Sequence, residues 1–143
     1  MQIEIDSTEA LVEAVPALLA SLGERRKIAL YGEMGAGKTT LVRAMGQHLG
    51  VRENIASPTF SLVNQYSYAA PDGTTALFHH LDLYRLNTAQ EALDIGIEDM
   101  LYDPWLCVIE WPQLVEAMLP NDAALLRIEV LDETQRRIVL SVV

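Results

Sequence analysis

The sequence predicts a small three-layer α/β domain whose central sheet is mixed, mainly parallel, and carries antiparallel hairpins. Three observations predict this fold. Apolar runs at 28–31 and 106–109 are typical of buried strands, a stretch with helical periodicity follows the first run, and the middle of the chain alternates like a hairpin. Because the chain has 143 residues, half of them apolar, we expect residues 1–143 to form a single domain around one core.

The elements of the first half follow from alternation, periodicity and stop signals. Asp6 and Glu9 have the spacing of a capping box that opens a helix, and Gly23 ends that helix. Gly50 is the stop signal of a second helix, whose apolar side chains recur at helical spacing. The predicted elements are, in order, a strand at 2–5, a helix at 10–22, a strand at 27–31 and a helix at 38–49.

The second half contains two predicted hairpins and several short helices. Aromatic and β-branched residues alternate on both sides of the turn at 69–74, which predicts the first hairpin. Thr88 is a candidate helix N-cap. The predicted elements are strands at 60–68 and 75–84, helical turns at 89–93 and 97–101, a strand at 106–109, a helix at 113–118, and a closing hairpin of strands at 125–130 and 136–142.

Residues 32–39 match the phosphate-binding P-loop pattern in full and lie between a predicted strand and a predicted helix. Glycines in such a loop let successive N–H groups point at phosphate oxygens, and the helix N-terminus adds its dipole. The fold class is therefore a P-loop NTPase domain that binds a nucleoside triphosphate, and ATP is favoured. The expected nucleotide-binding residues are Glu33, Met34, Gly35, Ala36, Gly37, Lys38, Thr39 and Thr40.

Two acidic residues follow apolar strand patterns and are candidates for holding Mg²⁺ and activating water. Asp82 ends the run from 76, and Glu110 ends the run from 106. Because the P-loop opens at the carboxyl edge of the sheet, both acids would lie beside it. We expect Lys38, Asp82 and Glu110 to be catalytic and Thr39, Asp82 and Glu110 to serve the metal ion. Which acid binds the ion directly stays open.

Other polar and aromatic residues have two readings each. The segment Ser57-Pro58-Thr59 has the position of a nucleotide-sensing switch, or it is a turn in which Pro58 fixes the backbone. Arg85 and Trp111 are possible rim or partner contacts, or a solvated charge and a packing residue. His79 and His80 are adjacent on a predicted strand, so they point to opposite faces and cannot share one metal ion.

Charge separates the possible functions. The formal net charge of −10 argues against direct binding of RNA or DNA. Between residues 44 and 126 only Arg52 and Arg85 are positive. This scarcity argues against a small-molecule kinase, because such enzymes usually carry several arginines on a lid. The Asn-Lys-x-Asp segment of GTPases does not occur. A non-catalytic, ATP-dependent interaction module remains an alternative to an ATPase.

The sequence also lacks a membrane-length apolar run and an ordinary secretion signal, so we expect a cytoplasmic protein.

Four segments in this order and spacing resemble the TsaE family: residues 32–40, 57–60, 80–85 and 108–111. The resemblance implies an ATPase that uses ATP and Mg²⁺ and is required for threonylcarbamoyladenosine modification of tRNA. It also implies docking on the TsaB–TsaD pair, with tRNA contacted only through those partners. By the same resemblance, Lys38 and Thr39 bind phosphates and magnesium, Thr59 belongs to the switch, and Asp82 and Glu110 serve magnesium and water.

Overall fold

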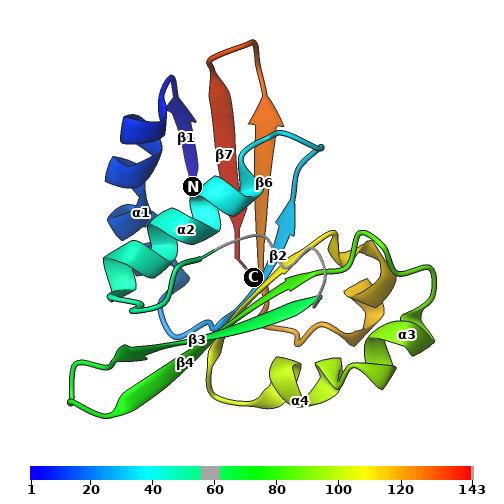
Figure 1. Ribbon diagram of the computed structural model, residues 1–143. Helices are drawn as coiled ribbons and strands as arrows, with labels where there is room; N and C mark the ends of the chain where they lie inside the picture. Colours follow the sequence, from blue (N-terminus) through cyan, green and yellow to red (C-terminus); the bar gives the residue numbers. More distant parts are fainter. Residues whose placement is uncertain (56–61, 143) are drawn as a thin grey trace.

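The computed structural model describes residues 1–55 and 62–142. Its elements follow the expected alternation of strands and helices (Figure 1). They are β1 (Gln2–Ile5), α1 (Thr8–Leu22), β2 (Lys27–Tyr31), α2 (Lys38–Leu49), β3 (Val63–Ala69), β4 (Thr75–Asp82), α3 (Ala89–Asp94), α4 (Ile97–Tyr102), β5 (Leu106–Glu110), the 3₁₀ helix η1 (Pro112–Met118), β6 (Ala124–Val130) and β7 (Arg136–Ser141).

The strands form one seven-stranded sheet in the order β1-β7-β6-β2-β5-β4-β3. Its core is parallel, because β2 pairs in parallel with β5 and β6, and β5 with β4. The hairpins β3–β4 and β6–β7 and the pair β1–β7 are antiparallel. This arrangement confirms the mixed sheet with a parallel core. It also brings the carboxyl ends of β2, β4, β5 and β6 to one edge, where ligands bind in open α/β sheets.

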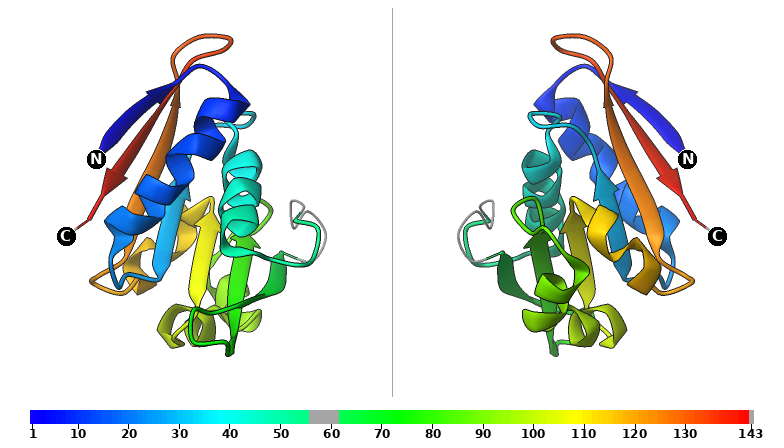
Figure 2. Two further views of the ribbon diagram at one scale, coloured as in Figure 1. Left: turned by 90° about the vertical axis from the view of Figure 1, so that its left-hand side faces the viewer. Right: turned by 90° about the vertical axis from the view of Figure 1, so that its right-hand side faces the viewer.

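Helices cover the two faces of the sheet separately (Figures 1 and 2). Helices α1 and α2 pack on one face, where Leu41 and Met45 meet Ile28 and Leu30 in the larger apolar cluster. On the other face, α3, α4 and η1 pack around a second cluster that includes Ile109 of β5. The domain therefore has three layers. In the described part of the chain, no helix has the length and apolarity needed to span a bilayer.

The start of α1 differs from the sequence prediction. The predicted capping box of Asp6 and Glu9 is wrong, because Ser7 is the N-cap and its hydroxyl oxygen accepts a hydrogen bond from the N–H of Ala10 at 3.0 Å. Serine and aspartate are both favourable caps, so the sequence alone placed the N-cap one residue early, while the helix itself begins at Thr8, two residues before the predicted start. At α3, by contrast, Thr88 caps the helix and Glu91 completes a capping box.

The remaining boundaries shift by a few residues. β4 ends at Asp82, two residues earlier than predicted. β3 begins at Val63, while residues 60 and 61 of the predicted strand lie outside the described residues. The short helix predicted at 113–118 is the 3₁₀ helix η1, with Pro112 at its first position, where the missing N–H of proline costs nothing.

Candidate functional site

The P-loop connects β2 to α2 at the carboxyl edge of the sheet. Gly35 and Gly37 adopt positive φ angles of 80° and 106°, a region that side chains rarely tolerate. These glycines let the backbone curl around the start of α2, and Gly37 itself is the N-cap of that helix. From β7, Arg136 Nε donates to the carbonyl oxygen of Ala36 at 3.2 Å and supports the loop from outside. The loop thus presents backbone N–H groups and a helix N-terminus to one cavity.

Lys38 is the first residue of α2, and its side chain is buried. Its Nζ donates to the carbonyl oxygen of Gly32 at 2.5 Å and lies 3.6 Å from the centroid of the Trp111 ring. Burial lowers the pKa of Lys38, while the charges of Glu110 and Asp82 partly offset that effect. The ammonium group is therefore held beneath an aromatic face and close to two acids.

Asp82 and Glu110 are paired by the register of β4 and β5. Each is the last residue of its strand, so their Cα atoms are neighbours at the sheet edge beside the P-loop. Glu110 is only 3 % exposed, whereas Asp82 is partly exposed. Burial raises the pKa of Asp82, and the nearby Glu110 carboxylate raises it further. Two carboxylates in one partly desolvated site are suited to a cation.

A cavity of about 310 Å³ brings the P-loop, the two acids and two aromatic side chains together. A second cavity of about 380 Å³ adjoins the loop, and both cavities are lined by Gly35, Gly37 and Thr40. The first is lined by Met34, Gly35, Gly37, Lys38, Thr39, Thr40, Asp82, Tyr84, Glu110 and Trp111. The second is lined mainly by the start of α1, by β6 and β7, and by the turn between them.

Some residues predicted from the sequence lie outside the first cavity. Glu33 is exposed and faces a different hollow beside β6. Ala36 is buried and contributes only to the second cavity. Arg85 is exposed and is absent from the described lining of the first cavity. The predicted switch Ser57-Pro58-Thr59 lies outside the described residues.

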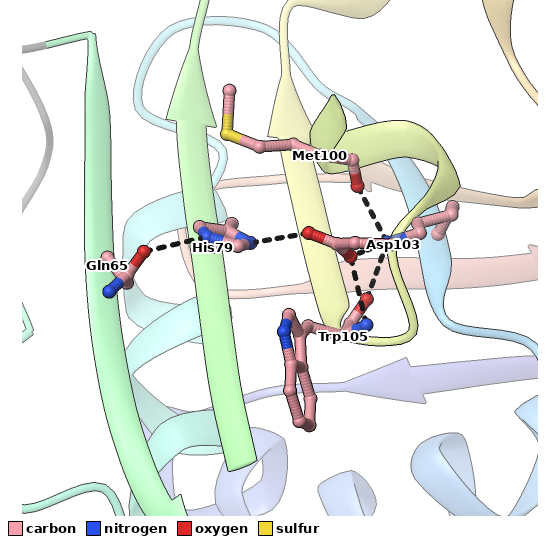
Figure 3. Close-up of polar contacts among 6 residues, drawn as sticks. Gln65, His79, Met100, Asp103 and Trp105 are labelled. Carbon is pink, nitrogen blue, oxygen red and sulfur yellow. Dashed lines mark hydrogen bonds and ion pairs between the residues drawn. The ribbon is translucent and has the colours of Figure 1, made fainter. Parts of the chain in front are cut away.

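His79 and His80 point to opposite faces of β4, as the strand alternation predicts. His79 Nε2 lies 3.0 Å from Gln65 Oε1, and its Nδ1 lies 3.7 Å from Asp103 Oδ2 (Figure 3). Asp103 Oδ1 accepts a 2.6 Å hydrogen bond from Lys27 Nζ. This polar network lies on the face of α3 and α4. His80 instead contacts Glu110 on the P-loop face.

Two neighbours of the site were not among the site residues predicted from the sequence. Tyr84 lines the cavity, and its ring centroid lies 5.0 Å from that of Trp111. His80 is fully buried against the Glu110 carboxylate. The sequence held a signal for His80, because it lies two residues before Asp82 on a strand and so shares its face. Nothing in the sequence pairs Tyr84 with Trp111, since the two are far apart in the chain.

A family model described as "Threonylcarbamoyl adenosine biosynthesis protein TsaE" matches residues 5–138. The chain belongs to the TsaE family. The match covers the whole P-loop region, the β3–β4 hairpin and the β6–β7 hairpin as far as residue 138, so the resemblance drawn from four short segments is confirmed. The fold is that of a P-loop protein of this family. Members of the TsaE family are involved in the threonylcarbamoyladenosine modification of tRNA.

Individual TsaE relatives agree with the family match. The TsaE protein of Haemophilus influenzae is 36% identical over 120 residues, covering 82% of this chain and 73% of the relative. That of Treponema pallidum is 35% identical and covers 84% of each chain. The crystal structure of YdiB from Bacillus subtilis aligns with a TM-score of 0.75 at 23% identity, over 100% of this chain and 85% of that one. This last likeness concerns the fold.

Proposed function

We propose that this protein is a Mg²⁺-dependent ATPase that sustains threonylcarbamoyladenosine modification of tRNA. The observation that carries the proposal is the cavity in which a complete P-loop meets Asp82 and Glu110. P-loop enzymes need a phosphate cradle, an acid for the metal ion and a group that orients water. The described residues fit all three needs, and family membership supports the pathway.

The residues divide the work by position. The N–H groups of residues 35–38 bind phosphate oxygens, and Lys38 moves from the Gly32 carbonyl onto the same phosphates. Thr39 offers its hydroxyl, and Asp82 and Glu110 their carboxylates, to magnesium or its water ligands. A bound magnesium ion supplies charge neutralisation at the β- and γ-phosphates. One of the two carboxylates accepts the proton of the attacking water.

The described residues also suit this kind of metal site. Among them, no cluster of three or more His, Cys, Asp or Glu side chains could hold a metal ion alone. Magnesium bound with a nucleotide takes only one or two carboxylates and fills its other positions with phosphate oxygens and water. Thr39 with Asp82 and Glu110 therefore matches magnesium better than a protein-only cage such as structural zinc.

The second cavity extends the site beyond the phosphates. Because it shares Gly35, Gly37 and Thr40 with the first cavity, a nucleotide whose phosphates occupy the loop can place its nucleoside there. Its walls combine apolar side chains such as Leu11 and Ile138 with polar groups such as Thr134. A mixed lining of this kind suits a base and a ribose.

Partners complete the proposal. We propose that the protein acts in the cytoplasm on the TsaB–TsaD pair, and that tRNA is held by those partners rather than by this acidic chain. The net charge of −10 supports indirect contact with tRNA. ATP would order the predicted switch Ser57-Pro58-Thr59 and an adjoining docking face, and hydrolysis would release the partners.

The decisive experiment measures Mg²⁺-dependent ATP hydrolysis by the protein alone and with purified TsaB–TsaD, with Lys38→Ala as the blank. We expect slow turnover alone and marked stimulation by the pair. ATP binding without turnover in either mixture would refute the ATPase and favour a non-catalytic interaction module. Transfer of phosphate to a small-molecule acceptor instead of water would favour a kinase.

A further inference from the structure

The carboxylate of Glu110 has a histidine partner inside the protein. His80 Nε2 is hydrogen-bonded to Glu110 Oε2. The His80 side chain is fully buried and that of Glu110 nearly so. A buried carboxylate needs a donor, and His80 supplies one. The same Glu110 lines the cavity beside Lys38 and Asp82.

The sheet places His80 where it can reach this carboxylate. In the parallel pair of β4 and β5, His80 is level with Val108, and Asp82 is level with Glu110. Residues two apart on a strand share a face, so His80, Asp82 and Glu110 all point toward α2. His80 thus approaches Glu110 diagonally across the strand pair, from two residues before the end of β4.

Among the described residues, Glu110 is the hydrogen-bond partner of the His80 ring. Its Nδ1 is buried without a hydrogen-bond partner among the described residues. A neutral imidazole carries one N–H, and a carboxylate partner selects the Nε2–H tautomer. With Oε2 held in this way, the remaining oxygen, Oε1, is the one left to face the cavity.

We propose that His80 is a positioning residue, whose Nε2–H fixes the Glu110 carboxylate so that Glu110 Oε1 is presented to the phosphate end of the cavity. This inference rests on the proposed ATPase function. Partners that orient a ligating carboxylate in this way are worth about 10–100-fold in activity or metal affinity. His80 itself touches neither nucleotide nor water in this role.

Replacement by glutamine and by methionine separates positioning from packing. The two side chains have similar length and volume, but only Gln keeps an N–H donor near the position of Nε2. We expect His80→Met to lower kcat about 10–100-fold with the KM for ATP changed less than about threefold. His80→Gln should restore most of kcat. His79→Met, on the opposite face of the same strand, is the matched control and should leave kcat unchanged.

Several kinetic results would overturn the inference. Equal losses of kcat in His80→Met and His80→Gln would mean that the residue only packs, as would a rise in KM at constant kcat. If the wild-type protein does not hydrolyse ATP even with TsaB–TsaD present, the proposed function is refuted instead. In that event the same Gln and Met comparison is made on the Mg²⁺-dependent affinity for ATP, where equal affinities would overturn the inference.

A spectrum of the nucleotide-free protein tests the hydrogen bond without any activity. Long-range ¹H–¹⁵N correlation should show His80 as the Nε2–H tautomer with a slowly exchanging, downfield proton. Glu110→Gln should move that proton upfield and leave the His79 signals in place. An Nδ1–H tautomer would contradict the proposed contact. A His80 proton whose chemical shift does not change in Glu110→Gln would contradict it as well.

Discussion

Lys38 Nζ lies 3.6 Å from the centroid of the Trp111 ring. Trp111 follows β5 in a left-handed backbone conformation, with φ of 54°, and this turn brings its ring over the lysine. The ring and the carbonyl of Gly32 thus hold the ammonium group beside the P-loop. Strain of this kind is typical of functional sites, and nucleotide binding would exchange these contacts for phosphate oxygens.

Lys38→Met should therefore abolish tight ATP binding without unfolding the protein. Loss of one charge-assisted hydrogen bond costs about 1.5–3 kcal/mol, or about 10- to 100-fold in affinity. Because burial lowers the pKa of Lys38, removing its charge should not lower the free energy of unfolding. Calorimetric titration with ATP measures the first effect and urea unfolding the second. A variant that binds ATP as tightly as the wild type would contradict this role.

Asp82→Asn should stabilise the protein at neutral pH while lowering ATP turnover. The pKa of Asp82 is raised in the folded state, chiefly by burial, so folded protein binds the proton more tightly than unfolded protein. Its favourable contribution is present below the unfolded pKa of about 3.9 and is lost as the pH rises through the folded pKa. Asn keeps an oxygen that can accept from the Tyr84 N–H, a 3.0 Å bond in the wild type.

The measurement compares urea unfolding of the wild type and Asp82→Asn at two pH values. The difference in unfolding free energy should be clear at pH about 7.5 and vanish near the unfolded pKa of about 3.9. If Asp82→Asn were destabilised equally at both pH values, the carboxylate would be held by contacts that asparagine cannot make.

Lys27→Met should lower the free energy of unfolding by about 3–5 kcal/mol, because it breaks a buried ion pair. Lys27 Nζ donates to Asp103 Oδ1 and to the carbonyl oxygens of Met100 and Trp105, each at 2.6 Å. Lys27 begins β2, at the opposite end from the P-loop, so the affinity for ATP should stay unchanged. Urea unfolding measures the loss of stability, and calorimetric titration measures the affinity for ATP.

Arg137→Met is the matched control for that variant. Arg137 pairs with Glu4 and Glu129 across β1, β7 and β6, but the three side chains are at least one-third exposed. Exposed ion pairs contribute little, so this loss should be far smaller than that of Lys27→Met. Equal losses in the two variants would mean that burial of Lys27 does not set the strength of its contacts.

His79 should make the protein less stable as the pH falls below neutrality. Burial lowers its pKa, and Lys27 adds to that effect while Asp103 opposes it. The unfolded chain therefore takes up a proton first, near the unfolded pKa of about 6.5, and stability falls from there down to the folded pKa. Above pH about 7.5 the imidazole is neutral in both states and stability is full.

Urea unfolding between pH about 7.5 and 5.5 measures this effect around the reference pKa of histidine. His79→Gln should flatten the pH dependence of the free energy of unfolding. His48 is exposed on α2, so His48→Gln is the control and should leave that dependence as in the wild type. An NMR titration that finds the His79 pKa above its reference value would reverse the expected sign.

Local signals explain how much of this molecule could be predicted from the sequence. The P-loop and the acids at the ends of β4 and β5 follow from short motifs and apolar runs, because strand ends meet at one edge of a parallel sheet. The contact of His80 with Glu110 could not be predicted, since it requires the register of two strands that lie thirty residues apart. The same holds for Lys27 and Asp103, which are joined only when α4 folds back onto the sheet.

The pairing of Asp82 with Glu110 limits how the length of this chain can change. Adding or removing one residue within β4 or β5 would reverse the facing of the side chains beyond that point, and would turn an acid away from Lys38. The turn after β3 is exposed at residues 71–74 and is distant from that edge. Insertions, affinity tags or the new termini of a circular permutant belong there, whereas β4 and β5 must keep their residue count for both acids to share one cavity.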